Sequence, residues 1–402
     1  MSILCYIFCV AYIILVLWFF IKIMRNGGFF LYSPLFLIYI SFITSDLLPA
    51  LSYASANNLP DNVQYVIIST IVVYFFFLFL YRKQFTKSII IKLPQQWKFA
   101  GFARKRVLLF FVLMAVLFST GLITGITRGI FSGADVEGLR RTSEIGIGFL
   151  RDIPRLGIKI IALIFLIAYY KNKTIKAGII CLGLGVFCFL IYGHKSEILN
   201  FALIFTFYYC FCHRNLRWYE VIAYYSVIPI AAGILQTIRQ GKDNFIENIT
   251  IFQNYTNILF KFNTLAVMQH FEAGNFFYWG EEYYIALVKV IPRFLWTDKP
   301  LSFDYRLKEL VGYDFEGGGV PVSTPFSLFI NFGYYNWIGL IVWLFVIHSF
   351  YGILIDVNKS FYAKMIVLFS LSTVIVAFIG NLEIMLLFLV LCLFIYGRKK
   401  MI

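Results

Sequence analysis

Long apolar runs separated by polar connections set the hydrophobic pattern of this chain. A transmembrane helix needs about 20 mostly apolar residues to cross the hydrocarbon core of a bilayer. The pattern predicts an all-α, polytopic integral membrane protein in which residues 1–402 form a single transmembrane domain. The first run has no basic residue before it and no small-residue cleavage site, which predicts an anchor rather than a signal peptide. Eleven spans are predicted, near residues 3–21, 29–51, 63–81, 107–126, 154–170, 177–192, 197–212, 219–236, 334–355, 363–379 and 383–397.

Lysines and arginines in the connections predict the orientation of these spans. Connections on the cytoplasmic side of a membrane carry an excess of both residues. With the eight cations of residues 82–106 placed in the cytoplasm, the inner connections hold 20 of the 35 basic residues, and the short outer connections hold only Lys195. The N-terminus is therefore predicted outside and the C-terminus inside. The same asymmetry explains the formal net charge of +15, so this charge does not indicate nucleic-acid binding.

The composition excludes several classes of function. Hydrophobic residues make up 61% of the chain and charged residues 14%, which is outside the range of soluble globular domains. All seven cysteines fall in predicted spans, where apolar packing is expected, and they form neither a disulfide framework nor a metal-type spacing. No nucleotide-binding fingerprint is present. We therefore expect no metal and no other cofactor.

Two long connections are predicted to face outward. The first is residues 127–153, and the second is an 88-residue segment, residues 237–324, which we call the lid. Apolar residues recur at helical spacing over 249–271, which predicts an amphipathic helix with Phe262 on its apolar face and Thr264 on its polar face. A second helix is predicted over 281–291. It opens with two glutamates, favourable at a helix N-terminus, and ends at a proline.

Three features of the outward-facing segments have two interpretations each. The lid aromatics, which include Tyr278 and Trp279, either form an interfacial belt or stack on sugar faces. The Gly317–Gly319 run is either a flexible turn or a close approach to an anion. The turn Gly193-His194-Lys195-Ser196-Glu197 suits helix capping, and its ionisable residues at the membrane edge also make it a functional candidate.

Arginines and lysines in the outward-facing segments suit a lipid-linked anion. The alternative is solvated ion pairs, worth about 0–1 kcal/mol each, because nearby carboxylates nearly balance them. A diphosphate-linked lipid would keep its tail in the bilayer and its headgroup at the outer surface, where the planar guanidinium fork binds phosphate oxygens. If the diphosphate is a leaving group, fixed cations stabilise the charge that grows on it in the transition state. A base near the acceptor hydroxyl would complete a glycosyl transfer.

The chain resembles the O-antigen polymerases (Wzy), the repeat-unit polymerases of bacterial surface polysaccharide. The resemblance lies in Phe260-Lys261-Phe262-Asn263 and in Ile291-Pro292-Arg293-Phe294-Leu295-Trp296-Thr297-Asp298-Lys299-Pro300. It continues through the three glycines and Pro325 to Asn331-Phe332-Gly333 and Gly339. The Gly193–Glu197 turn and the number of predicted spans also resemble those of this family. The resemblance covers about a quarter of the chain.

The resemblance implies a glycosyltransferase of lipopolysaccharide biosynthesis, similar to the GT-C class of folds, in the bacterial inner membrane. Its donor and acceptor would be undecaprenyl-diphosphate-linked oligosaccharides, and a chain-length regulator is a possible partner. By position, Arg293 and Lys299 would hold diphosphate, with Lys195, Arg140 and Arg141 as further contacts. Arg239 in the lid is a further candidate for this role.

The catalytic base and the exact activity stay open in the sequence. The family often has a glutamate shortly before Asn-Phe-Gly, but residues 325–330 read PFSLFI, with no acid. Glu282, Asp298 and His270 are the candidate bases, in that order. A lipid-linked-oligosaccharide flippase is the main alternative, although it would place polar residues inside the bundle and keep its outer loops short. An O-antigen ligase is the other, which differs from a polymerase in its acceptor.

Overall fold

The computed structural model describes seven continuous ranges and several isolated positions of the chain. The isolated positions lie between 158 and 166, between 200 and 220, between 291 and 301, and at 320. Every regular element in the described residues is helical, which confirms the all-α prediction. The continuous ranges are 2–25, 34–85, 173–192, 260–272, 277–288, 303–314 and 322–356.

Three stretches of helix are long and apolar enough to cross a membrane. They are α1 (Ile3–Arg25), α4 (Asp61–Leu80) and the Thr324–Ile353 stretch, which contains α16 (Thr324–Phe332), a short 3-10 turn, η4 (Gly333–Tyr335), and α17 (Asn336–Ile355). Their lengths follow from near-continuous apolar sequence. Helices α1 and α4 are uninterrupted, and the third stretch changes to a 3-10 turn at Gly333. Helices able to span a membrane are therefore confirmed, and the predicted spans near 3–21, 63–81 and 334–355 are helical as expected.

Two further predicted spans are apolar helices of shorter described length. The span near 29–51 appears as α2 (Pro34–Phe42), the π-helix η2 (Ile43–Leu47) and α3 (Leu48–Ala54). The span near 177–192 appears as α8 (Thr174–Tyr192). The isolated described positions of 154–170, 197–212 and 219–236 that have a regular assignment are helical. The spans predicted at 107–126, 363–379 and 383–397, and the connection at 127–153, lie outside the described residues.

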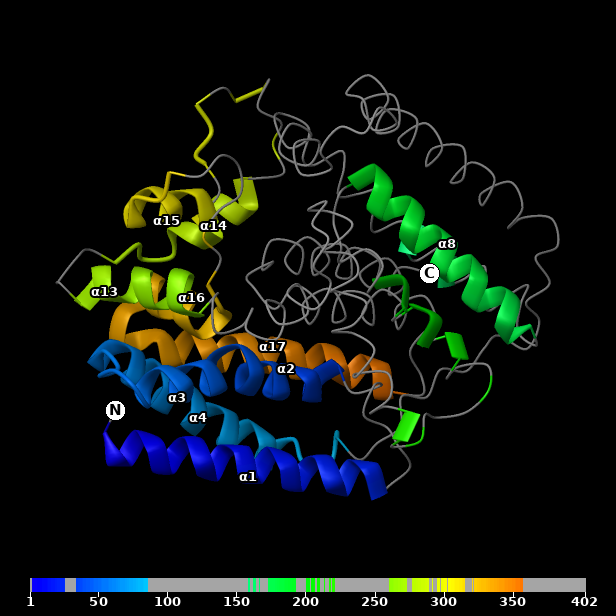
Figure 1. The fold of residues 1–402 in the computed structure, drawn as a ribbon, viewed down its shortest axis with the longest axis horizontal. Helices are drawn as coiled ribbons and strands as arrows, with labels where there is room; N and C mark the ends of the chain where they lie inside the picture. The colour runs from blue at the N-terminus through cyan, green and yellow to red at the C-terminus, as the bar shows by residue number, and fades with distance from the viewer. Residues whose placement is uncertain are drawn as a thin grey trace, which may run out of the picture.

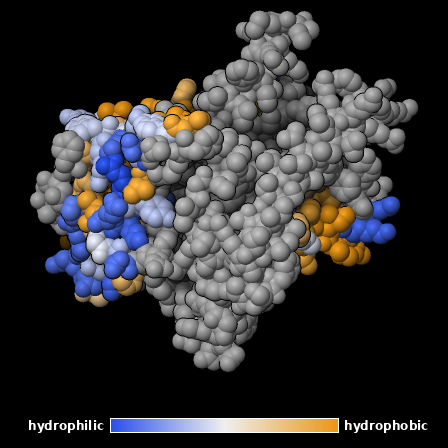
Figure 2. Space-filling model, turned by 90° about the horizontal axis from the view of Figure 1, so that it is seen from above, coloured by the Kyte–Doolittle hydropathy of each residue, from blue (hydrophilic) through white to orange (hydrophobic). Residues whose placement is uncertain are grey.

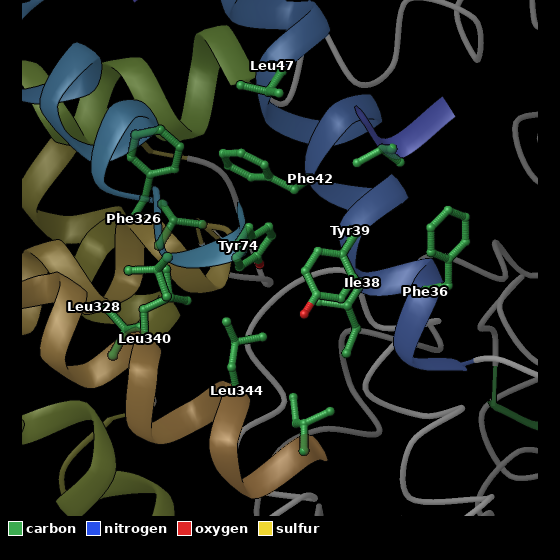
Figure 3. Close-up of a cluster of buried hydrophobic side chains, with 14 of the residues drawn as sticks. Phe36, Ile38, Tyr39, Phe42, Leu47, Tyr74, Phe326, Leu328, Leu340 and Leu344 are labelled. Atoms are coloured by element: carbon green, nitrogen blue, oxygen red, sulfur yellow. The ribbon is translucent and has the colours of Figure 1, made fainter. Parts of the chain in front are cut away.

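Helices α1, α2, α4 and α17 lie alongside one another (Figure 1). Aromatic side chains fill the space between them: Tyr12 meets Phe42 edge-on at 5.8 Å, and Tyr39 meets Tyr74 at 4.9 Å. Figure 3 shows side chains from α2, α4, α16 and α17 gathered in this one cluster. Because lipid is as apolar as these side chains, close packing rather than water exclusion holds the helices together.

The N-terminal ends of α1, α4 and α17 lie at the same end of the bundle. The Ser2 backbone nitrogen donates to Gln64 Oε1 at 2.8 Å, and the Tyr65 hydroxyl donates to the Tyr334 carbonyl at 2.6 Å. Lid residues contact the same end, because Asn62 Nδ2 donates to the Met268 carbonyl at 2.6 Å. These three helix ends and the lid are thus on one side, as the prediction of outward-facing segments requires.

A buried histidine joins three elements near the other end of α4. His348 of α17 is fully buried, and its Nε2 lies 2.8 Å from the Tyr39 hydroxyl of α2. Its Nδ1 lies 3.0 Å from Gln84 Oε1, in the turn after α4, and its ring stacks on Tyr81 at 4.1 Å. Since an amide oxygen only accepts, Nδ1 carries the proton and Nε2 accepts from Tyr39.

We expect His348→Leu to lower the free energy of unfolding by about 1–3 kcal/mol. Leucine fills a similar volume but leaves the buried Tyr39 hydroxyl and the partly buried Gln84 carbonyl without this partner. The measurement is the midpoint of thermal unfolding in detergent. Ser349→Ala is the control, because the Ser349 hydroxyl is exposed and bonds only to Phe345 of its own helix in the contacts described. Equal midpoints for both variants would contradict the assigned role.

The described lid consists of a π-helix, η3 (Phe260–Leu265), followed by three α-helices. These are α13 (Ala266–Glu272), α14 (Glu281–Val288) and α15 (Phe303–Val311), and α15 is not among the helices predicted from the sequence. The second predicted helix begins at Glu281 as expected, but the described helix ends at Val288 and Ile291 lies in a bend. Figure 2 shows hydrophilic residues gathered over the end where these helices lie.

The predicted polar face of the first lid helix is wrong at one position. Thr264, assigned to that face, is 5% exposed, whereas Phe262 of the predicted apolar face is 52% exposed and so is accessible to a membrane surface. The cause is η3, in which hydrogen bonds run from residue i to i+5. This wider turn changes which residues share a face, so a 3.6-residue period misplaces them. Residues 249–259 of that predicted helix lie outside the described residues.

Candidate functional site

Four of the nine predicted site residues lie in the described part of the chain. Glu282 is in the first turn of α14, and His270 is on α13. Asp298 and Lys299 follow Trp296 in a turn. The other five, Arg140, Arg141, Lys195, Arg239 and Arg293, lie outside the described residues.

The Glu282 carboxylate is held against α16 by two side chains. Its Oε2 accepts a hydrogen bond from Asn331 Nδ2 at 2.8 Å and another from the Ser327 hydroxyl. The Glu282 backbone nitrogen also donates to Asn331 Oδ1 at 3.3 Å. One asparagine therefore binds both the main chain and the side chain of Glu282. These bonds fix the carboxylate in place while the residue stays partly exposed.

The Asn331-Phe332-Gly333 motif docks the lid onto the end of α16. Asn331 is fully buried, and the Phe332 ring stacks on Tyr283 at 5.7 Å. Gly333 has a φ of +57°, and a side chain there would meet Phe277 at 2.8 Å. The Tyr278 backbone nitrogen donates to the Ile330 carbonyl at 3.1 Å. The motif thus positions the turn that starts α14, and Glu282 with it.

In the structure, a carboxylate from another helix lies beside the segment that precedes Asn331-Phe332-Gly333. Residues 325–330 contain no carboxylate, but Glu282 reaches Ser327 and Asn331 from α14, 49 residues before Asn331 in the chain. Glu282 is the first candidate base in the sequence, but no local pattern there predicts its contact with α16. The one feature of the sequence that could have indicated this contact is Ser327, a polar residue in an otherwise apolar helix, one turn before Asn331.

The adjacent glutamate has a different set of contacts. Glu281 forms an ion pair with Arg306 of α15, and the Arg306 guanidinium lies over the Tyr278 ring, 5.4 Å from its centroid. Burial raises the pKa of the Tyr278 phenol, an effect that Arg306 opposes. Burial, followed by the Glu282 charge, raises the pKa of Tyr283. Both phenols therefore stay neutral at ordinary pH.

The other described candidates lie on separate elements. Asp298 is exposed in its turn, and the half-buried His270 ring meets Phe271 edge-on at 5.9 Å. Lys299, predicted to hold diphosphate, donates from Nζ to the Ile291 carbonyl at 2.7 Å. This bond links the two ends of the segment 291–299, to which Arg293 belongs in the sequence. An ammonium has three donors, so the contact is compatible with a second role for Lys299.

A buried acid marks the place where the lid chain enters the bundle. Asp46, in η2, is 2% exposed and accepts a hydrogen bond from the Ser45 hydroxyl at 2.9 Å. The Ser323 hydroxyl, just before α16, interacts with the same carboxyl but makes no hydrogen bond of ordinary geometry. Buried ionisable residues in membrane spans are costly. Single π-helical turns often occur at functional sites.

Metal binding has no support in the described residues, where no group of three or more His, Cys, Asp or Glu side chains could hold an ion. Four of the cysteines, Cys5, Cys9, Cys181 and Cys188, are buried thiols, as predicted for apolar packing. Comparisons with family models, with curated proteins and with solved structures found no match for the chain. The function is therefore inferred from the sequence and from the contacts of the described residues.

Proposed function

We propose that the protein polymerises undecaprenyl-diphosphate-linked oligosaccharide repeat units into surface polysaccharide of the O-antigen type. It is an inner-membrane enzyme of about eleven spans with a GT-C-like fold. The lid and the N-terminus face the periplasm, and the C-terminus faces the cytoplasm. The positive residues of the short connections support this orientation. The donor and the acceptor are both lipid-linked, so their saccharides meet the lid at the membrane surface.

The observation that most directly supports this proposal is the position of the Glu282 carboxylate. Ser327 and Asn331 fix it where the lid meets an apolar helix long enough to span a membrane. A general base must be positioned at the acceptor hydroxyl before its pKa matters. This carboxylate is held at the membrane-facing edge of a polar lid, where a lipid-linked sugar would lie. A flippase has no need for such a group outside its transport path.

In the proposed reaction Glu282 accepts the proton of the acceptor hydroxyl as its oxygen attacks the anomeric carbon of the donor. A new glycosidic C–O bond forms, and the bond between that carbon and the diphosphate oxygen breaks. The undecaprenyl diphosphate leaves with the bonding electron pair. Arg293 and Lys299 stabilise the charge on it, with Arg140, Arg141, Lys195 and Arg239 as further phosphate contacts.

A deletion strain tests the function directly. Its surface polysaccharide, separated on a gel, should lose long chains while a single repeat unit still reaches the surface lipid. Loss of that single unit as well would point to a flippase or a ligase instead. A reporter fused near residue 300 tests the location separately, and a cytosolic signal would rule out the proposal.

We expect Arg293→Ala to abolish long chains while the protein level stays unchanged. Removing one fixed donor to a developing negative charge typically reduces turnover by about 10²–10³-fold. The readout is the chain-length distribution on the gel, with the protein quantified in membranes. Arg306→Gln is the matched control, because this lid arginine is engaged by Glu281 and Tyr278 and should leave chain length near wild type. Wild-type chains in the Arg293 variant would refute its role.

A further inference from the structure

Trp279, two residues before the start of α14, has a backbone conformation that its side chain disfavours. Trp279 has a φ of +47°, and no other non-glycine residue in the described ranges has a positive φ. Gly280 follows with a φ of +86°. In this left-handed region the Cβ atom crowds the following carbonyl oxygen, so glycine or asparagine fits with less strain. A bulky residue there is a conformational outlier and points to a function for its side chain.

Contacts on both sides hold this turn. The Tyr278 backbone nitrogen donates to Ile330, and the Glu281 nitrogen donates to the Tyr278 carbonyl at 3.0 Å. Phe277 stacks on Phe271 at 5.8 Å, and a Cβ at Gly280 would lie 3.5 Å from the Phe332 ring. The surrounding structure therefore fixes the strained backbone. With its neighbours packed inward, Trp279 remains 60% exposed.

An interfacial belt does not require this strain. Tyr334, Tyr335 and Trp337 also expose their rings at this end of the bundle, and all three do so without a positive φ. A ring that served only to anchor the protein at the interface could sit on ordinary helical backbone in the same way. The position of Trp279 differs in one further respect, because it lies three residues before Glu282.

We propose that Trp279 is a saccharide-stacking residue for the sugar bound beside Glu282. An indole presents a rigid apolar face that matches the C–H face of a pyranose, and polar groups at its rim can bind the hydroxyls. The strained turn places Trp279 just before α14, three residues before Glu282 in the chain. This inference deepens the proposed function and rests on it.

The test compares two substitutions at one position. The probe is the oligosaccharide repeat unit, released by mild acid from the lipid-linked intermediate of the source strain, and calorimetry measures its binding to the full-length protein in detergent. Trp279→Ala and Trp279→Gly should each weaken binding about tenfold, because both lack the ring. Trp279→Gly should also unfold at a higher temperature than Trp279→Ala, because glycine relieves the strain. Trp337→Ala, the control, should bind as the wild type does.

Wild-type affinity in Trp279→Ala overturns the inference, and so does failure of the wild-type protein to bind the released saccharide. Loss of binding in Trp337→Ala to the same extent also overturns it, since that result indicates a general effect of interfacial aromatics. The proposed function is judged separately, by the deletion strain and by Glu282→Gln. Normal binding in Trp279→Ala combined with an inactive Glu282 variant would leave the polymerase in place and remove only the stacking role.

Discussion

Glu282→Gln is expected to abolish long polysaccharide chains, with turnover reduced by about 10²–10⁴-fold, the usual contribution of a general base. Glutamine can still accept hydrogen bonds from Ser327 and Asn331 through its amide oxygen, so the junction between α14 and α16 is preserved. It cannot accept the proton of an acceptor hydroxyl. The measurement is chain length on a gel, with protein level and unfolding temperature recorded for the same variant.

Glu281→Gln is the matched control for this prediction. The two glutamates are adjacent in the first turn of α14, but Glu281 pairs with Arg306 of α15 rather than with α16. That ion pair is partly exposed, so its loss should cost little stability and leave long chains in place. If Glu282→Gln kept wild-type chains, the base would have to be Asp298 or His270. If both variants lost activity equally, the charge of the turn, rather than one carboxylate, would be responsible.

Gly333→Ala is expected to give the largest loss of stability. Gly333 has a φ of +57° and a ψ of −135°, a conformation that essentially only glycine adopts, so an alanine there costs about 1–3 kcal/mol of backbone strain. Its Cβ would also lie 2.8 Å from the Phe277 ring, and overpacking of this kind costs a further ~1–3 kcal/mol. Phe277 packs on Phe271 and Phe329, so it has little room to move. We expect a lower unfolding temperature together with shortened chains, because the lid turn that carries Glu282 is displaced.

Two other glycines separate the contributions to this effect. Gly312 has a φ of +72°, but no atom lies within 4 Å of the place that an added Cβ would take, so Gly312→Ala should show only the backbone cost. Gly352 lies in α17 with the same open space around it, and Gly352→Ala should be neutral or stabilising by about 0.5–1 kcal/mol. Among the three variants, we expect Gly352→Ala to unfold at the highest temperature, Gly312→Ala at an intermediate one and Gly333→Ala at the lowest. A Gly333 variant as stable as the Gly312 variant would remove the contact with Phe277 from the explanation.

Much of the helical architecture could be predicted from the sequence. The apolar runs near 3–21 and 63–81 are helices because a polar backbone in lipid must satisfy its hydrogen bonds internally, and this requirement depends only on local sequence. The start of α14 at Glu281 was predicted for the same kind of local reason. The faces of residues 260–265 were not, because packing selects a π-helix there and changes the period.

The sequence by itself determined that this is a helical membrane protein with a folded polar lid, and it placed Glu282 among the candidate bases. Only the tertiary structure decided that Glu282 lies against Ser327 and Asn331, that Asn331-Phe332-Gly333 docks the lid, and that Trp279 has a strained backbone. The physical reason is the range of the interactions. Hydropathy and helix propensity act over a few neighbouring residues, whereas the contact of α14 with α16 joins residues 49 positions apart and depends on how whole helices pack.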